Sequence, residues 1–397
     1  MNKLANKLCY SIFFVCIIIF LGLTLYEISN YPGINGDEAW YGNKAYYIHQ
    51  TSVLKNLSGM GNYTGVIVPF TFYVFNLIFG FSYATCRLAS VCGGLITVIL
   101  TFIFLRKKFS NTTAIATTLI LITSIFFISY SRFATQHIWL TTYLIAAYFF
   151  FDKSFETEKI TAKIFCLMLS IFTIALSIQI LPPTILFYIF MLSYLKISRA
   201  NLKKIFVNKF FVVFLLIFIL GTFSTFIYTS NIVLKIIKMN FGYIKDYGIF
   251  NIILELSTRF LKYCLVFNQT LAGYRSLLYF SGILPNTALQ IFMQILYACS
   301  LVLTLTLLFS NNNRDKMLIK YLLLTFFLTP LFLEFFNKNM HFPLLGEERY
   351  LFTFYPFVII AIVRALELII IQRLSSTKFF WLIIILIFIL QISLFAF

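Results

Sequence analysis

Long apolar stretches, separated by short polar segments, dominate the chain. A membrane-spanning helix requires about 20 apolar residues. The stretches that approach this length cover residues 9–29, 86–105, 112–130, 138–151, 160–180, 183–198, 208–229, 287–309, 317–336, 350–371 and 378–397. None shows the two-residue alternation of a β-strand. The pattern therefore predicts an all-α polytopic membrane protein with about eleven transmembrane helices.

One further apolar stretch, residues 66–81, decides the topology. It is short, contains Pro69 and ends at Gly80 and Phe81. If it does not span the membrane, nearly every short basic cluster, such as the one at 106–108, falls on the same side as the N-terminus. Lysine and arginine accumulate in short cytoplasmic loops, so that side is predicted to be cytoplasmic. If 66–81 did span, every later loop would invert and the rule would fail. We therefore place 66–81 in the membrane interface, within a first outer loop over about 30–85.

Composition supports the membrane assignment. Hydrophobic residues make up 61% of the 397 positions and charged residues 11%, with a mean hydropathy of +0.92. A soluble domain is nearer half apolar and a quarter charged. The net charge of +18 would suggest nucleic acid as a partner in a soluble protein. Here the basic residues lie in loops that face anionic lipid headgroups, so we expect membrane lipids and no nucleic acid.

The cysteines and the termini add little chemistry. None of the seven cysteines forms a CxxC pair, and most lie in apolar stretches, where they act as small packing residues. Lys3 and Lys7 precede an apolar stretch with no small-residue cleavage site, which predicts an uncleaved first helix. We expect one membrane domain over residues 1–397, with no separate soluble domain.

Two adjacent acids stand out just beyond the first predicted helix. Asp37 and Glu38 adjoin in a chain that has only 13 acidic residues. Two interpretations stay open: the pair caps a helix and favours its dipole, or one carboxylate is a general base or metal ligand. The predicted topology puts further ionisable residues on the same outer face, namely His49, His137, His341, Glu347, Glu348, Arg132, Arg349 and Lys338. Arg364 and Glu367 fall in the cytoplasmic half and are spaced to pair with each other.

An outer-face cluster of carboxylates and guanidiniums suits a lipid-linked sugar phosphate. Arginine binds phosphate oxygens bidentately, and a carboxylate can take the proton of an attacking hydroxyl or amine. Trp40 and Tyr41 could stack on a sugar, or they could be ordinary residues of the interfacial aromatic belt. A divalent cation on Asp37, Glu38 and His137 is a further option, although no spacing motif requires a metal and no other cofactor is expected.

Short motifs on this face follow one another in a characteristic order. They are Asp37-Glu38-Ala39-Trp40-Tyr41, Pro69-Phe70-Thr71-Phe72-Tyr73, Arg87-Leu88, Ser131-Arg132-Phe133-Ala134 and Glu348-Arg349-Tyr350-Leu351. In this order the sequence resembles the GT-C glycosyltransferases, above all the branch of protein O-mannosyltransferases and bacterial aminoarabinose transferases acting on lipid A. The resemblance implies a GT-C-like fold with interfacial helices in the first outer loop. One departure is Gln136-His137, which stands where family members often carry an acidic residue.

The resemblance also implies a reaction and a set of roles. A sugar would move, with inversion, from a polyprenyl-phosphate donor to a glycan, lipid or protein acceptor on the outer face. The implied catalytic residues are Asp37 and Glu38; the implied donor-phosphate and lipid ligands are Arg349, Tyr350, Arg132 and Arg87; the implied supporting residues are His137, His341, Glu348, Lys338, Trp40 and Tyr41. The expected location is a bacterial cytoplasmic (inner) membrane, with the N-terminus in the cytoplasm.

Two other classes of function remain open from the sequence. A polysaccharide polymerase or ligase would depend on a large outer loop, and the loop at about 230–286 carries several basic residues. A non-enzymatic flippase or transporter of lipid-linked glycans would require polar residues near the membrane midplane. Asp37→Asn discriminates the polymerase, which should tolerate it, from a GT-C enzyme, which should lose turnover. Substitution of a midplane polar residue should stop transport and leave a transferase unaffected.

Overall fold

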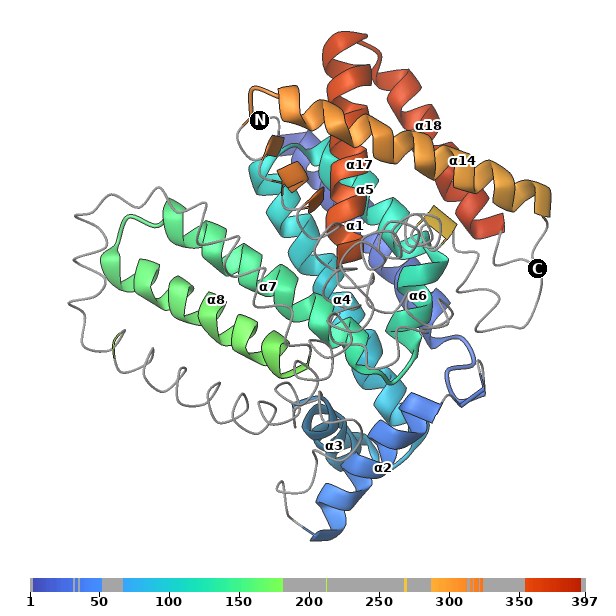
Figure 1. Cartoon of the computed structure of the whole chain (residues 1–397), viewed down its shortest axis with the longest axis vertical. Helices are drawn as coiled ribbons and strands as arrows, with labels where there is room; N and C mark the ends of the chain where they lie inside the picture. The colour runs from blue at the N-terminus through green and yellow to red at the C-terminus, as the bar shows by residue number, and fades with distance from the viewer. Residues whose placement is uncertain are drawn as a thin grey trace, which may run out of the picture.

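The described part of the chain is entirely helical. The computed structural model describes residues 3–30, 33–34, 36–51, 67–180, 212, 268–269, 287–312, 315–316, 318–320, 322–323 and 354–393. Its elements are α1 (Lys3–Leu25), α2 (Gly36–Thr51), α3 (Ile67–Phe79), α4 (Tyr83–Lys108), α5 (Asn111–Thr123), α6 (Ile125–Arg132), α7 (Gln136–Glu156), α8 (Ile160–Ile180), α14 (Thr287–Thr304), η2 (Leu305–Phe309), α17 (Tyr355–Leu366), η4 (Glu367–Arg373) and α18 (Thr377–Ser393) (Figure 1). The all-α prediction is confirmed.

Several of these helices are suited to crossing a membrane. Among the described residues, five are long and apolar enough: Asn6–Leu25, Tyr83–Lys108, Ile160–Ser177, Ile291–Phe309 and Tyr355–Arg373. The pair α5 and α6 makes a sixth if it counts as one span, bent by 63° between its two parts. The chain is therefore an integral membrane protein. The total of eleven spans stays a prediction, because the predicted spans 183–198 and 208–229 lie outside the described residues, apart from residue 212.

Local sequence signals explain where the central helices begin and end. The side chain of Ser82 caps α4 by accepting a hydrogen bond from the backbone N–H of Thr85 at 3.1 Å. At the other end of α4, Arg106, Lys107 and Lys108 occupy the last turn, where positive charge is favoured by the helix dipole. Ser110 then caps α5 in the same way as Ser82 caps α4. These signals end α4 after three cationic residues and begin α5, which returns into the bundle.

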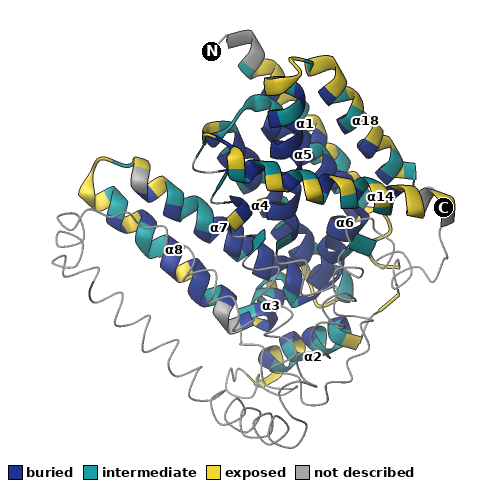
Figure 2. Cartoon of the chain, turned by 45° about the horizontal axis from the view of Figure 1, so that its top comes forward, coloured by how far each residue is buried: buried dark blue, intermediate teal, exposed yellow. Residues whose placement is uncertain are grey.

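Helix α4 lies at the centre of the bundle because two adjacent glycines let its neighbours approach. A methyl group on Gly94 would lie only 2.6 Å from Ser131 Oγ of α6 and 2.9 Å from Phe20 Cζ of α1. One on Gly93 would lie 3.4 Å from Thr142 Oγ1 of α7. Small residues commonly permit such close helix packing in membranes. Figure 2 shows the resulting buried core along α4, α5 and α6, while α7 and α8 lie side by side as a flanking pair.

Helices α2 and α3 pack against each other at one end of the bundle (Figure 1). Helix α3 contains 13 residues, so it is roughly 20 Å long at the usual rise per residue. This length falls short of the hydrocarbon core, which is about 30 Å thick. The observed length agrees with the assignment of 66–81 to the interface instead of a span.

The opposite end of the bundle gathers the residues predicted to be cytoplasmic. Lys108 at the end of α4 forms ion pairs with Asp152 and Glu156 of α7. Arg106 donates hydrogen bonds to Tyr10 Oη and to Asn6 Oδ1 near the start of α1. The end of α4, the end of α7 and the start of α1 therefore meet at one end of the bundle, as the predicted topology requires.

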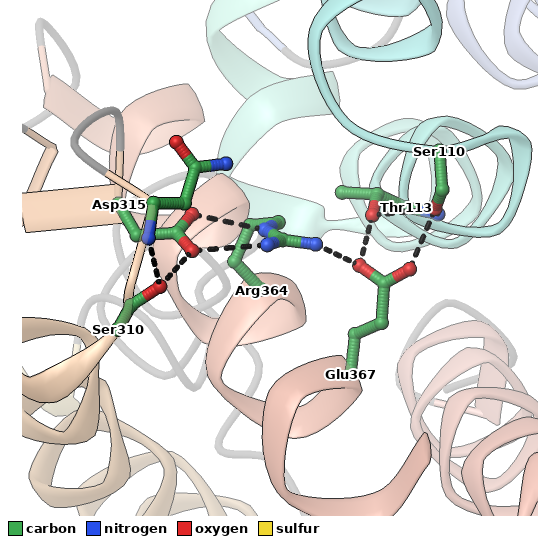
Figure 3. Close-up of polar contacts among 7 residues, drawn as sticks. Ser110, Thr113, Ser310, Asp315, Arg364 and Glu367 are labelled. Atoms are coloured by element: carbon green, nitrogen blue, oxygen red, sulfur yellow. Dashed lines mark hydrogen bonds and ion pairs between the residues drawn. The ribbon is translucent and has the colours of Figure 1, made fainter. Parts of the chain in front are cut away.

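The predicted pairing of Arg364 with Glu367 is confirmed, and the structure extends it (Figure 3). Arg364 also contacts Asp315, from Nε to Oδ1 at 3.1 Å and from Nη2 to Oδ2 at 3.0 Å. Ser110 and Thr113 at the start of α5 donate hydrogen bonds to Glu367. This buried ionic cluster fastens α17 and η4 to α5 at the predicted cytoplasmic end.

One predicted helix is divided in two. The apolar stretch 112–130 was expected to form a single span, but α5 ends at Thr123 and α6 begins at Ile125. Neither proline nor glycine occurs at this point. The predicted span 112–130 therefore corresponds to two helices bent by 63°, which pass as one span together, and polar side chains instead of a proline lie at the bend.

Candidate functional site

The first turn of α2 carries the two acids in different surroundings. Asp37 and Glu38 both lie near the N-terminus of the helix, where its dipole favours negative charge. Asp37 keeps part of its surface exposed, whereas Glu38 is fully buried. The favourable interaction with the helix dipole that the sequence left open is thus present, and the two acids differ in how far they are exposed.

Glu38 is held by a buried two-point ion pair. Arg87 of α4 donates from Nε to Oε1 at 2.6 Å and from Nη2 to Oε2 at 2.7 Å. The backbone N–H of Ala134 donates to the same Oε1 at 3.0 Å. Arg87 is 1% exposed and Glu38 is 0% exposed. Because a buried charge pair is stable only with such close geometry and added hydrogen bonds, Glu38 fixes the start of α2 onto α4 and onto the turn after α6.

Two arginines hold the end of α1 and the segment after it. Arg87 also donates hydrogen bonds to the carbonyls of Ile28, at 2.9 Å, and Gly33, at 3.4 Å. Arg132 donates to the carbonyls of Leu23, at 2.9 Å, and Tyr26, at 2.6 Å. Carbonyls at the end of a helix lack partners within it and favour positive charge. The guanidiniums predicted to bind the donor phosphate thus contact backbone carbonyls in this structure, and their role toward phosphate stays a prediction.

A second contact joins α2 to the start of α7. The hydroxyl of Tyr41 donates to Gln136 Oε1 at 2.6 Å, and the ring of Tyr41 packs edge-on against Trp40 and Phe72. The residue found in place of the family's acid therefore accepts a hydrogen bond from α2. The bond between Tyr41 and Gln136 and the bond between Glu38 and Ala134 together fix the first two turns of α2. They thereby fix the backbone that carries Asp37.

His137 is buried beside this contact. Its ring lies 5.5 Å from that of Tyr130, nearly perpendicular to it. Within the described residues, no group of three or more histidine, cysteine, aspartate and glutamate side chains is arranged to hold a metal ion. Asp37, Glu38 and His137 are therefore not brought together as a ligand set.

Some predicted site residues lie outside the described part of the chain. They are Lys338, His341, Glu348, Arg349 and Tyr350. Lys44, by contrast, was missed by the sequence reasoning. It lies seven residues after Asp37 on the same face of α2, with Nζ 5.8 Å from the ring centre of Trp40 and 5.9 Å from that of Tyr47. Its helical spacing from Asp37 was the available signal.

Comparison with known proteins found one family match and several structures of similar fold. Residues 64–228 match the family described as dolichyl-phosphate-mannose-protein mannosyltransferase. The chain is also similar to the Archaeoglobus fulgidus oligosaccharyltransferase in complex with Zn and sulfate, with a TM-score of 0.56 and 15% identity over 96% of this chain and 52% of that one. The same enzyme tethered to an acceptor peptide gives a TM-score of 0.52 and 12% identity over 97% and 54%.

Apo ArnT from Cupriavidus metallidurans is a weaker match, with a TM-score of 0.44 and 12% identity over 91% of this chain and 77% of that one, too low to establish a shared fold. No curated protein matches the sequence. The chain spans about half the length of the archaeal enzyme. At these identities the likeness to the archaeal enzyme shows the fold alone.

Proposed function

We propose that this chain, a member of the GT-C glycosyltransferase class by its fold and its family match, is a membrane glycosyltransferase that uses a polyprenyl-phosphate sugar. The observation that carries the proposal is that two adjacent acids differ in burial and in their contacts. Glu38 is buried in an ion pair with Arg87, whereas Asp37 stays partly exposed on the same helical turn. A fixed backbone and an accessible carboxylate are what a general base requires.

The proposed reaction is a single displacement on the outer face. Asp37 takes the proton from an acceptor hydroxyl or amine as that group attacks the anomeric carbon. The bond from this carbon to the phosphate oxygen breaks, and the electron pair leaves with the polyprenyl phosphate. The anomeric configuration therefore inverts, and no covalent intermediate with the enzyme forms. Arg349 and Tyr350, assigned by resemblance, would stabilise the charge on the leaving phosphate.

The contacts around α2 support the position of this base. General-base catalysis contributes about 10²–10⁴-fold only when the base lies within hydrogen-bond reach of the proton. The bonds of Glu38 to Arg87 and Ala134, together with the bond of Tyr41 to Gln136, hold the turn that carries Asp37 from two sides. Lys44, on the same helical face, is a further cation available to an anionic donor.

A transfer assay tests the proposal. Purified protein in lipid receives radiolabelled polyprenyl-phosphate sugars together with glycan, lipid and protein acceptors. We expect sugar transfer by the wild type and a loss of about 100-fold or more in Asp37→Asn. Glu156→Gln, at the opposite end of the bundle, is the matched acid-to-amide control and should keep full turnover. No transfer with any pair, or full activity in Asp37→Asn, would exclude the proposal.

The same proposal includes an orientation. We place the N-terminus and the α4–α5 connection in the cytoplasm of a bacterial cell, and α2 on the outer side of its cytoplasmic membrane. A reporter fused after Lys108 should then signal cytoplasm, and one fused after Ser131 should signal the outside. Reversed signals would contradict the orientation without affecting the fold.

A transporter of lipid-linked glycans is the second candidate, because polar side chains do occur inside the bundle. Thr123, Ser124, Tyr297, Tyr355 and Gln391 are all buried. They bond to one another, however, so they form a closed cluster. A transport reaction would persist in Asp37→Asn, and the transfer assay therefore separates the two functions.

A further inference from the structure

The break between α5 and α6 is held by polar side chains. Ser124, between the two helices, has an extended backbone with φ −66° and ψ 120°. Its Oγ accepts a hydrogen bond from the N–H of Phe127 at 3.3 Å and so caps α6. Thr123 Oγ1 donates to the carbonyl of Leu119 at 2.8 Å. Serine and threonine thus provide the alternative hydrogen bonds that permit a bend without proline.

Three later helices fasten this break. Ser124 Oγ and the hydroxyl of Tyr355, at the start of α17, lie 2.5 Å apart. The single hydroxyl proton of Thr123 is shared between the Leu119 carbonyl and Gln391 Oε1 of α18, which lies 2.7 Å from Thr123 Oγ1. Gln391 Nε2 donates to Tyr297 Oη of α14, also at 2.7 Å. A polar group in this setting is stable only when it is hydrogen-bonded. The angle of the break therefore depends on partners that are distant in sequence.

Tyr355 is joined to α6 in a second way. Its ring lies 5.1 Å from Phe126, and Phe126 lies 5.1 Å from Tyr130. Tyr130 lies 5.5 Å from His137 at the start of α7. All three pairs pack edge to face, which is a favourable arrangement for aromatic rings. A series of rings therefore supports α6 along its length, from the start of α17 to the start of α7.

Helix α6 carries the groups that hold the candidate site. Arg132, its last residue, binds the carbonyls at the end of α1, and Ala134 just beyond it binds Glu38. The helix has eight residues, so it is roughly 12 Å long, and a 10° change at the break would move its far end by about 2 Å. A shift of about 1 Å at an active site can cost on the order of 100-fold in rate.

We propose that Tyr355 is a positioning residue for the transferase site, an inference that rests on the proposed function. Its hydroxyl and its ring set the direction of α6, and α6 sets the contacts that hold the turn of Asp37. Tyr355 also follows Arg349 by only six residues in the sequence. Tyr355, which contacts α6, is thus also the first residue of α17, the described helix that follows Arg349 and Tyr350 in the sequence.

Tyr355→Phe removes the hydroxyl and keeps the ring, which makes it the test variant. We expect kcat to fall roughly five- to twentyfold, with KM for donor and acceptor unchanged. In a double-mutant cycle with Arg132→Lys, the double variant should lose about as much as the more impaired single variant, because both act through α6. Tyr10→Phe is the control: its hydroxyl accepts a hydrogen bond from Arg106 at the opposite end of the bundle, so any effect it has should multiply with that of Arg132→Lys.

Hydrogen exchange provides a readout that does not require activity. The amides of the first turns of α2 should exchange faster in Tyr355→Phe than in the wild type, and at the wild-type rate in Tyr10→Phe. Faster exchange without any wild-type transfer would support the positioning role while the proposed function fails. Multiplying losses in the cycle, an effect on KM alone, or wild-type exchange in Tyr355→Phe would overturn the inference.

Discussion

The guanidinium of Arg87 and the carboxylate of Glu38 form a buried two-point ion pair across 49 residues of sequence, with contacts of 2.6 and 2.7 Å. This pair distinguishes two acids that look equivalent in the sequence. It removes Glu38 from solvent and leaves its neighbour Asp37 partly exposed. The ion pair thereby connects the stability of the fold with the placement of the proposed base.

Breaking this pair from one side should be costly. Arg87→Met leaves a buried carboxylate without its cation, which typically costs about 3–5 kcal/mol. Glu38→Leu leaves the opposite charge and should cost a similar amount. The double variant Glu38→Leu/Arg87→Met should recover most of the stability but not the turnover, because the bond to Ala134 is lost. Thermal unfolding and transfer assays on the three variants check this, and wild-type unfolding of both single variants would refute it.

Arg132 offers a test between two roles. If its task is to hold the end of α1, Arg132→Lys should lower kcat on the order of tenfold, because lysine cannot reach two carbonyls at once. Binding of the polyprenyl-phosphate donor should then be unchanged. If Arg132 binds the phosphate instead, the Kd of the donor should rise while the rate of the bound complex changes less. Equilibrium binding of the donor, combined with single-turnover rates, separates the two results.

The ionic cluster at the other end should matter for stability alone. Arg364→Met leaves Asp315 and Glu367 buried without their shared cation, which should lower stability by about 3–5 kcal/mol. The surviving folded protein should keep its specific turnover, because the cluster (Figure 3) contacts Ser110, beyond the end of α4 that lies away from α2. Turnover normalised to folded protein measures this, and a parallel loss of specific activity would mean that the two ends are coupled.

Apolar length and charge predicted the parts of the fold that depend on local sequence. The stretch 86–105 became the central α4, and the i, i+3 pair of Arg364 and Glu367 formed as expected. The break at Ser124 was not predicted, because its partners Tyr355 and Gln391 lie more than 200 residues away in the sequence. Local patterns contain no information about such partners.

The candidate site shows the same limit. Asp37, Glu38, Arg87 and Arg132 were each singled out, and the structure brings Glu38 and Arg87 into contact. The resemblance implied that each arginine binds the donor phosphate, and guanidinium groups suit phosphate oxygens. The same donors also suit backbone carbonyls at a helix end, and only tertiary packing decides which of these partners is within reach.

The central claim is that Asp37 is the base of a sugar transfer and not merely a helix cap. The direct measurement is the single-turnover rate of Asp37→Asn with saturating donor and acceptor, alongside donor binding and thermal stability. Asparagine keeps the size of the side chain in the first turn of α2 but cannot accept the proton. We predict a rate that is lower by about 100-fold or more, with donor binding unchanged and stability within about 1 kcal/mol of the wild type. A rate close to that of the wild type would contradict the claim.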